Sequence, residues 1–200
     1  MDIKSGTHGE CSWEINNEGI LRLFPTDGKS GTLASQMGLE FTSPWEQYGK
    51  EVNKVVVEPG VEAGKDMAFL FYDLEICKEM DLSGLDTSNA VMMSSAFAGC
   101  SSLESLDLRN FNTENVKDVM LLFEDCKNLK HLDMSGLEFP KMERSRGIFK
   151  GCDSLRDLKL GKETSLLFSK ELPDIKGFEG KSWKPPKLKE QAKNKDTLEH

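Results

Sequence analysis

The chain has 200 residues, of which 38% are hydrophobic and 30% are charged, and its formal net charge is −8. The apolar fraction is large enough for a core, which argues against disorder, and the acidic charge argues against nucleic-acid binding. Apolar runs are too short to span a bilayer, and five cysteines, an odd number, argue against a small disulfide-bonded scaffold.

Residues 1–54 are expected to form an N-terminal capping region. The opening residues lack the apolar run of a signal peptide. Apolar residues alternate over 11–15, a turn-forming Asn-Asn-Glu-Gly stands at 16–19, and a second apolar strand follows over 20–24. This pattern predicts a β-hairpin.

A helix is expected shortly after this hairpin. Ser43 would cap its N-terminus, Pro44 would take the first helical position, and Glu46 would complete the capping box. Trp45 and Tyr48 would then share one face, on which Val52 also lies. We expect these side chains to cover the first turn of the repeats described next; a carbohydrate- or peptide-binding platform is the alternative.

The centre of the chain is a repeat. Three rows of 26 residues align without gaps between residues 81 and 158. Self-similarity at this period is typical of leucine-rich repeats, which stack into a solenoid because one unit cannot bury its apolar side alone. Five columns are identical in all rows: Asp81/Asp107/Asp133, Phe97/Phe123/Phe149, Cys100/Cys126/Cys152, Leu103/Leu129/Leu155 and Leu106/Leu132/Leu158.

One row predicts a strand, a turn and a helix. Leu103, Leu106 and Leu108 form the L-x-x-L-x-L signature, and the last two lie on one face of a short strand. Asn115 then resembles a helix cap, and apolar residues follow at helical spacing over 116–123. The fold class is therefore a right-handed α/β leucine-rich repeat solenoid.

The remaining boundaries follow from these assignments. The repeats are expected to span 55–165 in about four turns, and 166–183 to form a C-terminal cap. Residues 184–200 form a basic, Pro- and Lys-containing tail that cannot bury a core, and it ends in what reads as the start of a cloning tag. The final turn is expected to be covered by Leu166, Leu167, Phe168 and Trp183.

Two segments carry a family resemblance. Asp-Leu-Ser-Gly-Leu-Asp-Thr-Ser-Asn-Ala at 81–90 and Ala-Phe-Ala-Gly-Cys-Ser-Ser-Leu at 96–103 resemble the repeat of the BspA-type leucine-rich repeat surface proteins of bacteria. The match covers about residues 55–165. The resemblance implies a secreted or cell-surface protein that adheres to host or extracellular protein or glycan. The alternative is a structural spacer, without its own ligand, inside a larger surface protein.

Leucine-rich repeats usually bind partners on the concave strand face. Three aspartates share one column there, so a calcium-type cation site is one reading, and local backbone or ion-pair bonding is the preferred one. We expect no metal ion. The candidate ligand-binding residues face outward beside the leucine columns: Glu79, Asp81, Asp107, Arg109, His131, Asp133 and Lys159.

The cysteine column is expected to be a buried ladder of free thiols, because cysteine packs as a small hydrophobe and no zinc-type spacing is present. The sequence also lacks H-E-x-x-H, G-x-S-x-G and G-x-G-x-x-G motifs. We therefore expect a non-enzymatic protein without a cofactor. A monomer is expected.

Overall fold

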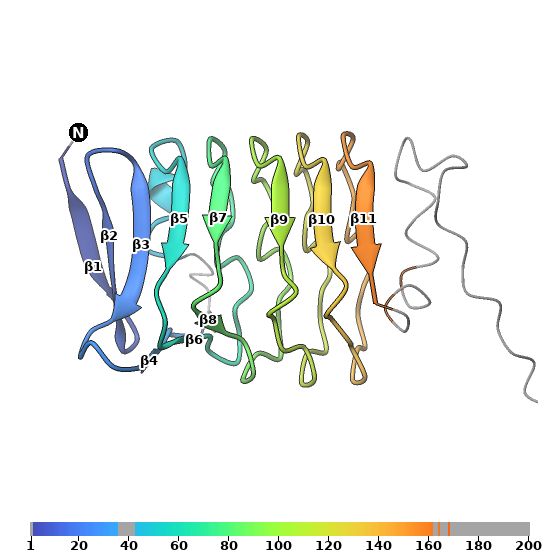
Figure 1. Cartoon of the computed structure of the whole chain (residues 1–200), viewed down its shortest axis with the longest axis horizontal. Coiled ribbons are helices and arrows are strands. Elements are labelled where there is room, and N and C mark those ends of the chain that lie inside the picture. Colours follow the sequence, from blue (N-terminus) through green and yellow to red (C-terminus); the bar gives the residue numbers. More distant parts are fainter. Residues whose placement is uncertain (1, 36–42, 162–163, 165–167, 169–200) are drawn as a thin grey trace, which may run out of the picture.

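The chain coils into a β-solenoid, which the computed structural model describes for residues 2–35, 43–161, 164 and 168. Figure 1 shows short strands stacked side by side in one row along the long axis. Five successive strands each open one turn, so the solenoid has about five turns, one more than the repeat count indicates. These strands are β5 (Lys54–Val57), β7 (Glu79–Asp81), β9 (Ser105–Asp107), β10 (His131–Met134) and β11 (Asp157–Leu160).

The N-terminal end of the row is closed by a meander. β2 (Cys11–Ile15) and β3 (Ile20–Pro25) form the predicted hairpin, and β3 pairs in parallel with β5. β1 (Lys4–His8), which the sequence pattern did not predict, pairs antiparallel with β2 and lies at the outer edge of this sheet.

The row of strands is hydrogen-bonded in two blocks. One sheet runs in the order β1-β2-β3-β5-β7, and another runs β11-β10-β9. β7 and β9 are neighbours in Figure 1, yet no ladder of backbone hydrogen bonds joins them in the described structure. The other junctions of the row pair in parallel, as expected for a stacked repeat.

A second side of the solenoid begins with three very short parallel strands, β4 (Gly31–Thr32), β6 (Val61–Glu62) and β8 (Leu85–Asp86). In the following turns, hydrogen bonds of threonine side chains take the place of the backbone ladder between these short strands. The Thr87 hydroxyl accepts a bond from the Asn112 amide and donates to the Asn112 carbonyl, at 2.8 and 3.0 Å. Thr113 bonds Glu138 of the following turn in the same way.

The predicted repeat helix is wrong. The helical structure with described bounds is a single 3₁₀ turn, η1 (Glu46–Tyr48). In the segment predicted to be helical, Asp118 forms isolated parallel bridges with the neighbouring turns of the solenoid, and residues 120–125 form consecutive turns. Backbone amides along this segment bond alternately to the next turn and to a residue three positions back. Leu121 donates to Arg146, for example, and Leu122 donates to Val119. Three-residue turn spacing therefore produces the apolar periodicity that resembles a helix.

Left-handed backbone positions keep this segment from becoming helical. Two columns of the repeat have positive φ, and a helix needs negative φ throughout. In the second column aspartate and glycine alternate: Asp73, Gly99, Asp125 and Gly151. A Cβ atom at Gly99 would overlap the Asp73 carboxylate, and a Cβ atom at Gly151 would overlap the Asp125 carboxylate.

An aromatic stack runs through the core. Phe71, Phe97, Phe123 and Phe149 lie one per turn, with ring centroids 5.7, 5.7 and 6.0 Å apart. Trp45 stacks on the first of these rings at 6.5 Å, so it covers the first turn as expected and is fully buried. Its burial excludes it from a ligand platform in this conformation.

The sequence predicted a cap at each end of the solenoid, and the structure tests these two predictions to different extents. Ser43 does not cap a helix: Trp45 precedes the 3₁₀ turn, and no side chain bonds its N-terminus. At the other end Phe168 packs edge-on against Phe149 and is buried, as expected. The other residues predicted for that cap, and the basic tail, lie outside the described residues.

The cysteine ladder is confirmed. Cys100, Cys126 and Cys152 are free and buried, and each thiol donates to a phenylalanine carbonyl of the preceding turn at 3.0–3.1 Å. Burial raises the pKa of Cys126 well above its usual value and raises that of Cys152 to about 12. Cys11 and Cys77 are also buried, and burial raises the pKa of each to about 11.

We therefore expect the native protein to resist thiol reagents. The attacking species is the thiolate, which burial and raised pKa values both suppress. At mildly alkaline pH, dithionitrobenzoate should titrate all five thiols after unfolding in guanidinium and essentially none beforehand. Rapid reaction of the three cysteines of the ladder in the folded protein would contradict the buried arrangement.

Candidate functional site

The candidate residues lie on one surface, which we call the strand face. It consists of the outward-facing side chains of β5, β7, β9, β10 and β11, together with Ser83, Arg109 and Ser135, which follow the aspartate column by two positions. Alternation along each strand places leucines inward and polar residues outward. All seven predicted residues are on this face, but the structure divides them into two groups.

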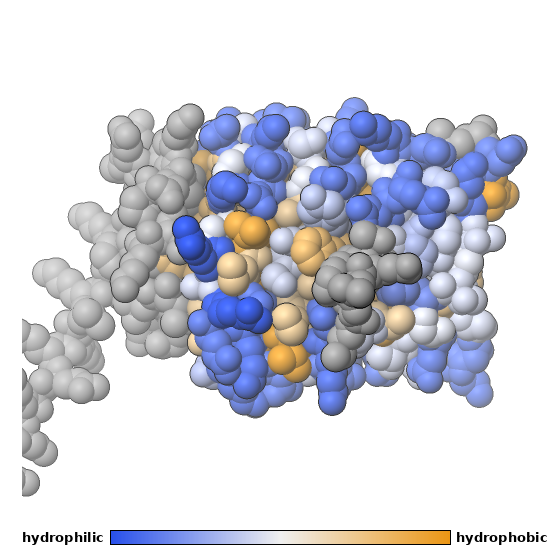
Figure 2. Space-filling model, turned by 180° about the vertical axis from the view of Figure 1, so that it is seen from behind, coloured by the Kyte–Doolittle hydropathy of each residue, from blue (hydrophilic) through white to orange (hydrophobic). Residues whose placement is uncertain are grey.

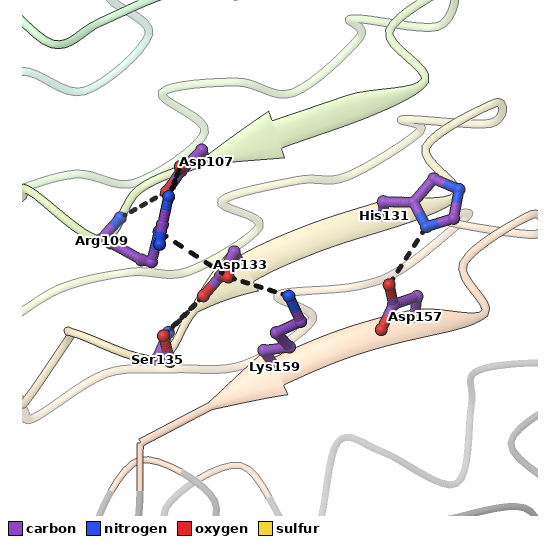
Figure 3. A network of polar contacts seen from close by, with 7 residues as sticks. All are labelled: Asp107, Arg109, His131, Asp133, Ser135, Asp157 and Lys159. Atoms are coloured by element: carbon purple, nitrogen blue, oxygen red, sulfur yellow. Dashed lines mark hydrogen bonds and ion pairs between the residues drawn. The ribbon is translucent and has the colours of Figure 1, made fainter.

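Asp107, Arg109, Asp133 and Lys159 form a charged network across three strands (Figure 3). Arg109 makes a two-pronged contact with Asp107, with its terminal nitrogen 2.6 Å from the carboxylate, and lies 3.8 Å from Asp133. Lys159 reaches the same Asp133 carboxylate at 3.3 Å. The basic side chains therefore separate carboxylates that would otherwise repel one another.

Each aspartate of the column also holds the turn that follows its strand. The Asp81, Asp107 and Asp133 carboxylates accept the backbone amide two residues on, at 3.0–3.1 Å. This is the local bonding preferred from the sequence. In the described part of the chain, no three His, Cys, Asp or Glu side chains are grouped so that they could hold a metal ion.

These bonds keep the carboxylates ionised. A hydrogen bond from the Ser83 hydroxyl lowers the pKa of Asp81, and the Arg109 guanidinium lowers that of Asp107. Burial raises the pKa of Asp133, but hydrogen bonds from Ser135 and from Lys159 outweigh it and hold the pKa below its usual value.

His131 lies at the other end of β10 from the charged network. Its Nδ1 atom is 3.2 Å from the Asp157 carboxylate on β11, and both side chains are about half exposed. A shallow depression of about 180 Å³ separates this pair from the network. Its lining residues are Ser105, Leu106, Asp107, His131, Leu132, Asp133, Asp157 and Lys159.

Glu79 and Asp81 stand apart from this depression. They belong to β7, in the other sheet block, where Glu79 pairs with Lys54 at 2.7 Å. Asp157 is not among the predicted candidates, although it lies one 26-residue repeat after His131. Strand alternation already places Asp157 on the outward side, but it does not show that this residue bonds His131.

Two other pockets contain none of the candidate residues. A pocket of about 250 Å³ near Asp73 and Asp125 is acidic and contains none of the candidates. Figure 2, which shows the side opposite the strand face, has small apolar areas separated by hydrophilic side chains. In the described structure Ile3 and Ile76 are the large hydrophobic residues more than a third exposed. No helix in the described residues is long and apolar enough to cross a membrane.

The fold and the strand face define a β-solenoid built from a leucine-containing repeat of 26 residues. Residues 43–160 match the model of the family described as "Mycoplasma protein of unknown function, DUF285", and the chain belongs to this family.

Two solved structures resemble it in fold. A leucine-rich repeat protein from Eubacterium ventriosum is 10% identical, with a TM-score of 0.46, and the match covers 82% of this chain and 46% of that one. A leucine rich cell surface protein from Faecalibacterium prausnitzii is 17% identical, with a TM-score of 0.43, over 81% and 44%. The chain thus spans less than half the length of either. No curated protein matches it.

Proposed function

We propose that the protein is a non-enzymatic interaction module of a bacterial surface, and that the strand face over β9, β10 and β11 binds an extracellular protein or glycan. The surface location rests on the resemblance of the repeat to BspA-type proteins.

The observation that carries the binding proposal is the charged network beside its depression. Arg109 and Lys159 are each about 60% exposed, while their charges are held in place by Asp107 and Asp133. Preset charges of both signs on a rigid sheet lose little entropy when a partner binds. Electrostatic complementarity of this kind supplies specificity and steers association.

The test is a double charge reversal, Arg109→Glu with Lys159→Glu. Wild-type protein should bind at least one member of a panel of immobilised matrix proteins and printed glycans, and the variant should bind it at least about tenfold more weakly, a change of about 1.4 kcal/mol. Because both side chains are exposed, the variant should keep the circular dichroism spectrum of the folded protein.

Lys29→Glu is the matched control. Lys29 is exposed in the turn before β4, at the N-terminal end of the molecule and away from the strand face. This control should bind as wild type does. If wild type binds no member of the panel, or if the double variant binds as well as the control, the binding proposal is wrong.

A structural spacer is the second candidate, and one observation favours it. The charges of the strand face bond mainly one another, either within a turn, as Arg109 bonds Asp107, or across one turn, as Lys159 bonds Asp133 and His131 bonds Asp157. A spacer predicts that Lys159→Ala lowers the thermal midpoint slightly and changes no binding to any panel member.

A further inference from the structure

The depression on the strand face is a furrow that runs across β9, β10 and β11. Two rows of outward side chains form its walls, because every second residue of a strand points to the same side. The rows stand two residues apart along the strands, roughly 7 Å, and Figure 3 shows His131 and Asp133 separated in this way along β10. One wall consists of Ser105, His131 and Asp157, and the other of Asp107, Asp133 and Lys159.

The floor of the furrow leaves recognition to the side chains of the walls. Leu106 and Leu132 line it, and both side chains are buried. The backbone of β10, under the middle of the furrow, pairs with β9 on one side and with β11 on the other. An extended peptide laid across this face therefore finds no open strand edge, and such an edge is what strand addition requires.

The two walls present both hydrogen-bond donors and acceptors. A carboxylate can only accept, so the His131 Nδ1 atom, 3.2 Å from Asp157, carries the proton of that bond. In the neutral ring Nε2 is then an acceptor. Ser105 is exposed on the same wall and adds a hydroxyl group. Across the furrow, Lys159 uses one of its three N–H donors on Asp133.

These walls suit a neutral ligand that is rich in hydroxyl groups. A hydroxyl donates and accepts at the same oxygen, whereas an ammonium group only donates and a carboxylate only accepts. The volume of about 180 Å³ is smaller than the roughly 300–1,000 Å³ of a pocket for a drug-sized molecule, which favours a single ring. We propose that the furrow binds one sugar residue of a glycan. This inference rests on the proposed binding role of the strand face and commits that role to a glycan rather than a protein.

Two variants test the furrow itself. Ser105→Tyr puts a ring into the depression from an exposed strand position, where tyrosine is well tolerated. Asp157→Asn keeps the shape of the side chain but replaces one acceptor oxygen by a donor. On a printed array of neutral and acidic glycans, wild type should bind at least one glycan, and the free methyl glycoside of one of its sugars should compete. Each variant should bind that glycan at least about tenfold more weakly.

Asn17→Tyr and Asp86→Asn are the matched controls. They introduce the same side chains at exposed positions away from the strand face, in the turn between β2 and β3 and in β8, and should bind as wild type does. Glycan binding that survives either furrow variant, or that no methyl glycoside inhibits, would overturn the inference. Binding of matrix proteins without any glycan would also overturn it and leave the proposed function standing, whereas binding of neither would overturn both.

Discussion

Replacing Phe123 by alanine is expected to lower the free energy of unfolding by about 3–5 kcal/mol. Phe123 is fully buried in the middle of the aromatic stack, between Phe97 and Phe149, with centroid distances of 5.7 and 6.0 Å. Truncation removes one ring from an otherwise continuous stack and leaves a cavity that the neighbouring turns cannot close. Chemical denaturation monitored by circular dichroism measures the loss.

Two further variants make this result interpretable. Phe123→Leu keeps most of the volume and should cost only about 1 kcal/mol, which gives a folded protein even if the alanine variant does not fold. Phe24→Ala removes a half-buried ring that lies 5.5 Å from the Arg22 guanidinium, and it should cost clearly less than Phe123→Ala. Equal losses for the two alanine variants would contradict the role of the stack.

The second large effect is expected at Gly99. Gly99→Ala should destabilise the fold by about 2–5 kcal/mol, because two costs add. The residue has φ near +77°, where a side chain is strained. Its new Cβ would also overlap the Asp73 carboxylate of the preceding turn. Urea unfolding of the variant and of wild type measures the difference.

Gly28→Ala separates the two costs. Gly28 has a similar φ of +74°, but nothing lies within 4 Å of the position that a Cβ would take. This control should therefore lose only the backbone part, about 1–2 kcal/mol. Adding Asp73→Gly to Gly99→Ala should recover the remainder. If the double variant is no more stable than Gly99→Ala, the carboxylate is not the obstacle.

The strands could be predicted because their signal is local. Alternation over Cys11–Ile15 and the spacing of Leu106 and Leu108 follow directly from the two-residue period of a strand. The buried cysteines followed from the repeat, since identical columns of a solenoid lie against one another. The phenylalanine column was also visible in the sequence, but its stacking was not predicted. β1 was missed because its sequence, Lys-Ser-Gly-Thr-His, has no apolar alternation.

The helix was predicted wrongly for a physical reason. Val116, Val119 and Phe123 are spaced as on a helix, but consecutive three-residue turns give almost the same spacing. What decides between the two is the destination of the backbone hydrogen bonds: every second amide bonds the next turn of the solenoid, and the amides between them bond a residue three positions back. Leu121 and Asp125 do not themselves indicate a left-handed backbone, since neither residue is glycine; the sequence signal lies in the glycines of the same columns, Gly147, Gly99 and Gly151.

The candidate site was predictable in part. The strand period places all of its residues on one face, but it does not show which charges meet. The charged network depends on Arg109 reaching sideways across a turn to Asp133, whereas Glu79 and Asp81 are cut off by the missing ladder between β7 and β9. At that junction no basic side chain among the described residues bridges Asp81 and Asp107, whereas Arg109 bridges Asp107 and Asp133.

Because aspartate and glycine alternate at Asp73, Gly99, Asp125 and Gly151, the turns of the solenoid match in pairs. Each aspartate fills the space that only a glycine above it leaves free, so the unit that fits onto itself is two turns, not one. Excising a single 26-residue row would set Asp73 beneath Asp125, carboxylate against side chain, whereas excising two rows would restore the match. Proteins built on this repeat should therefore lengthen and shorten most readily by even numbers of turns.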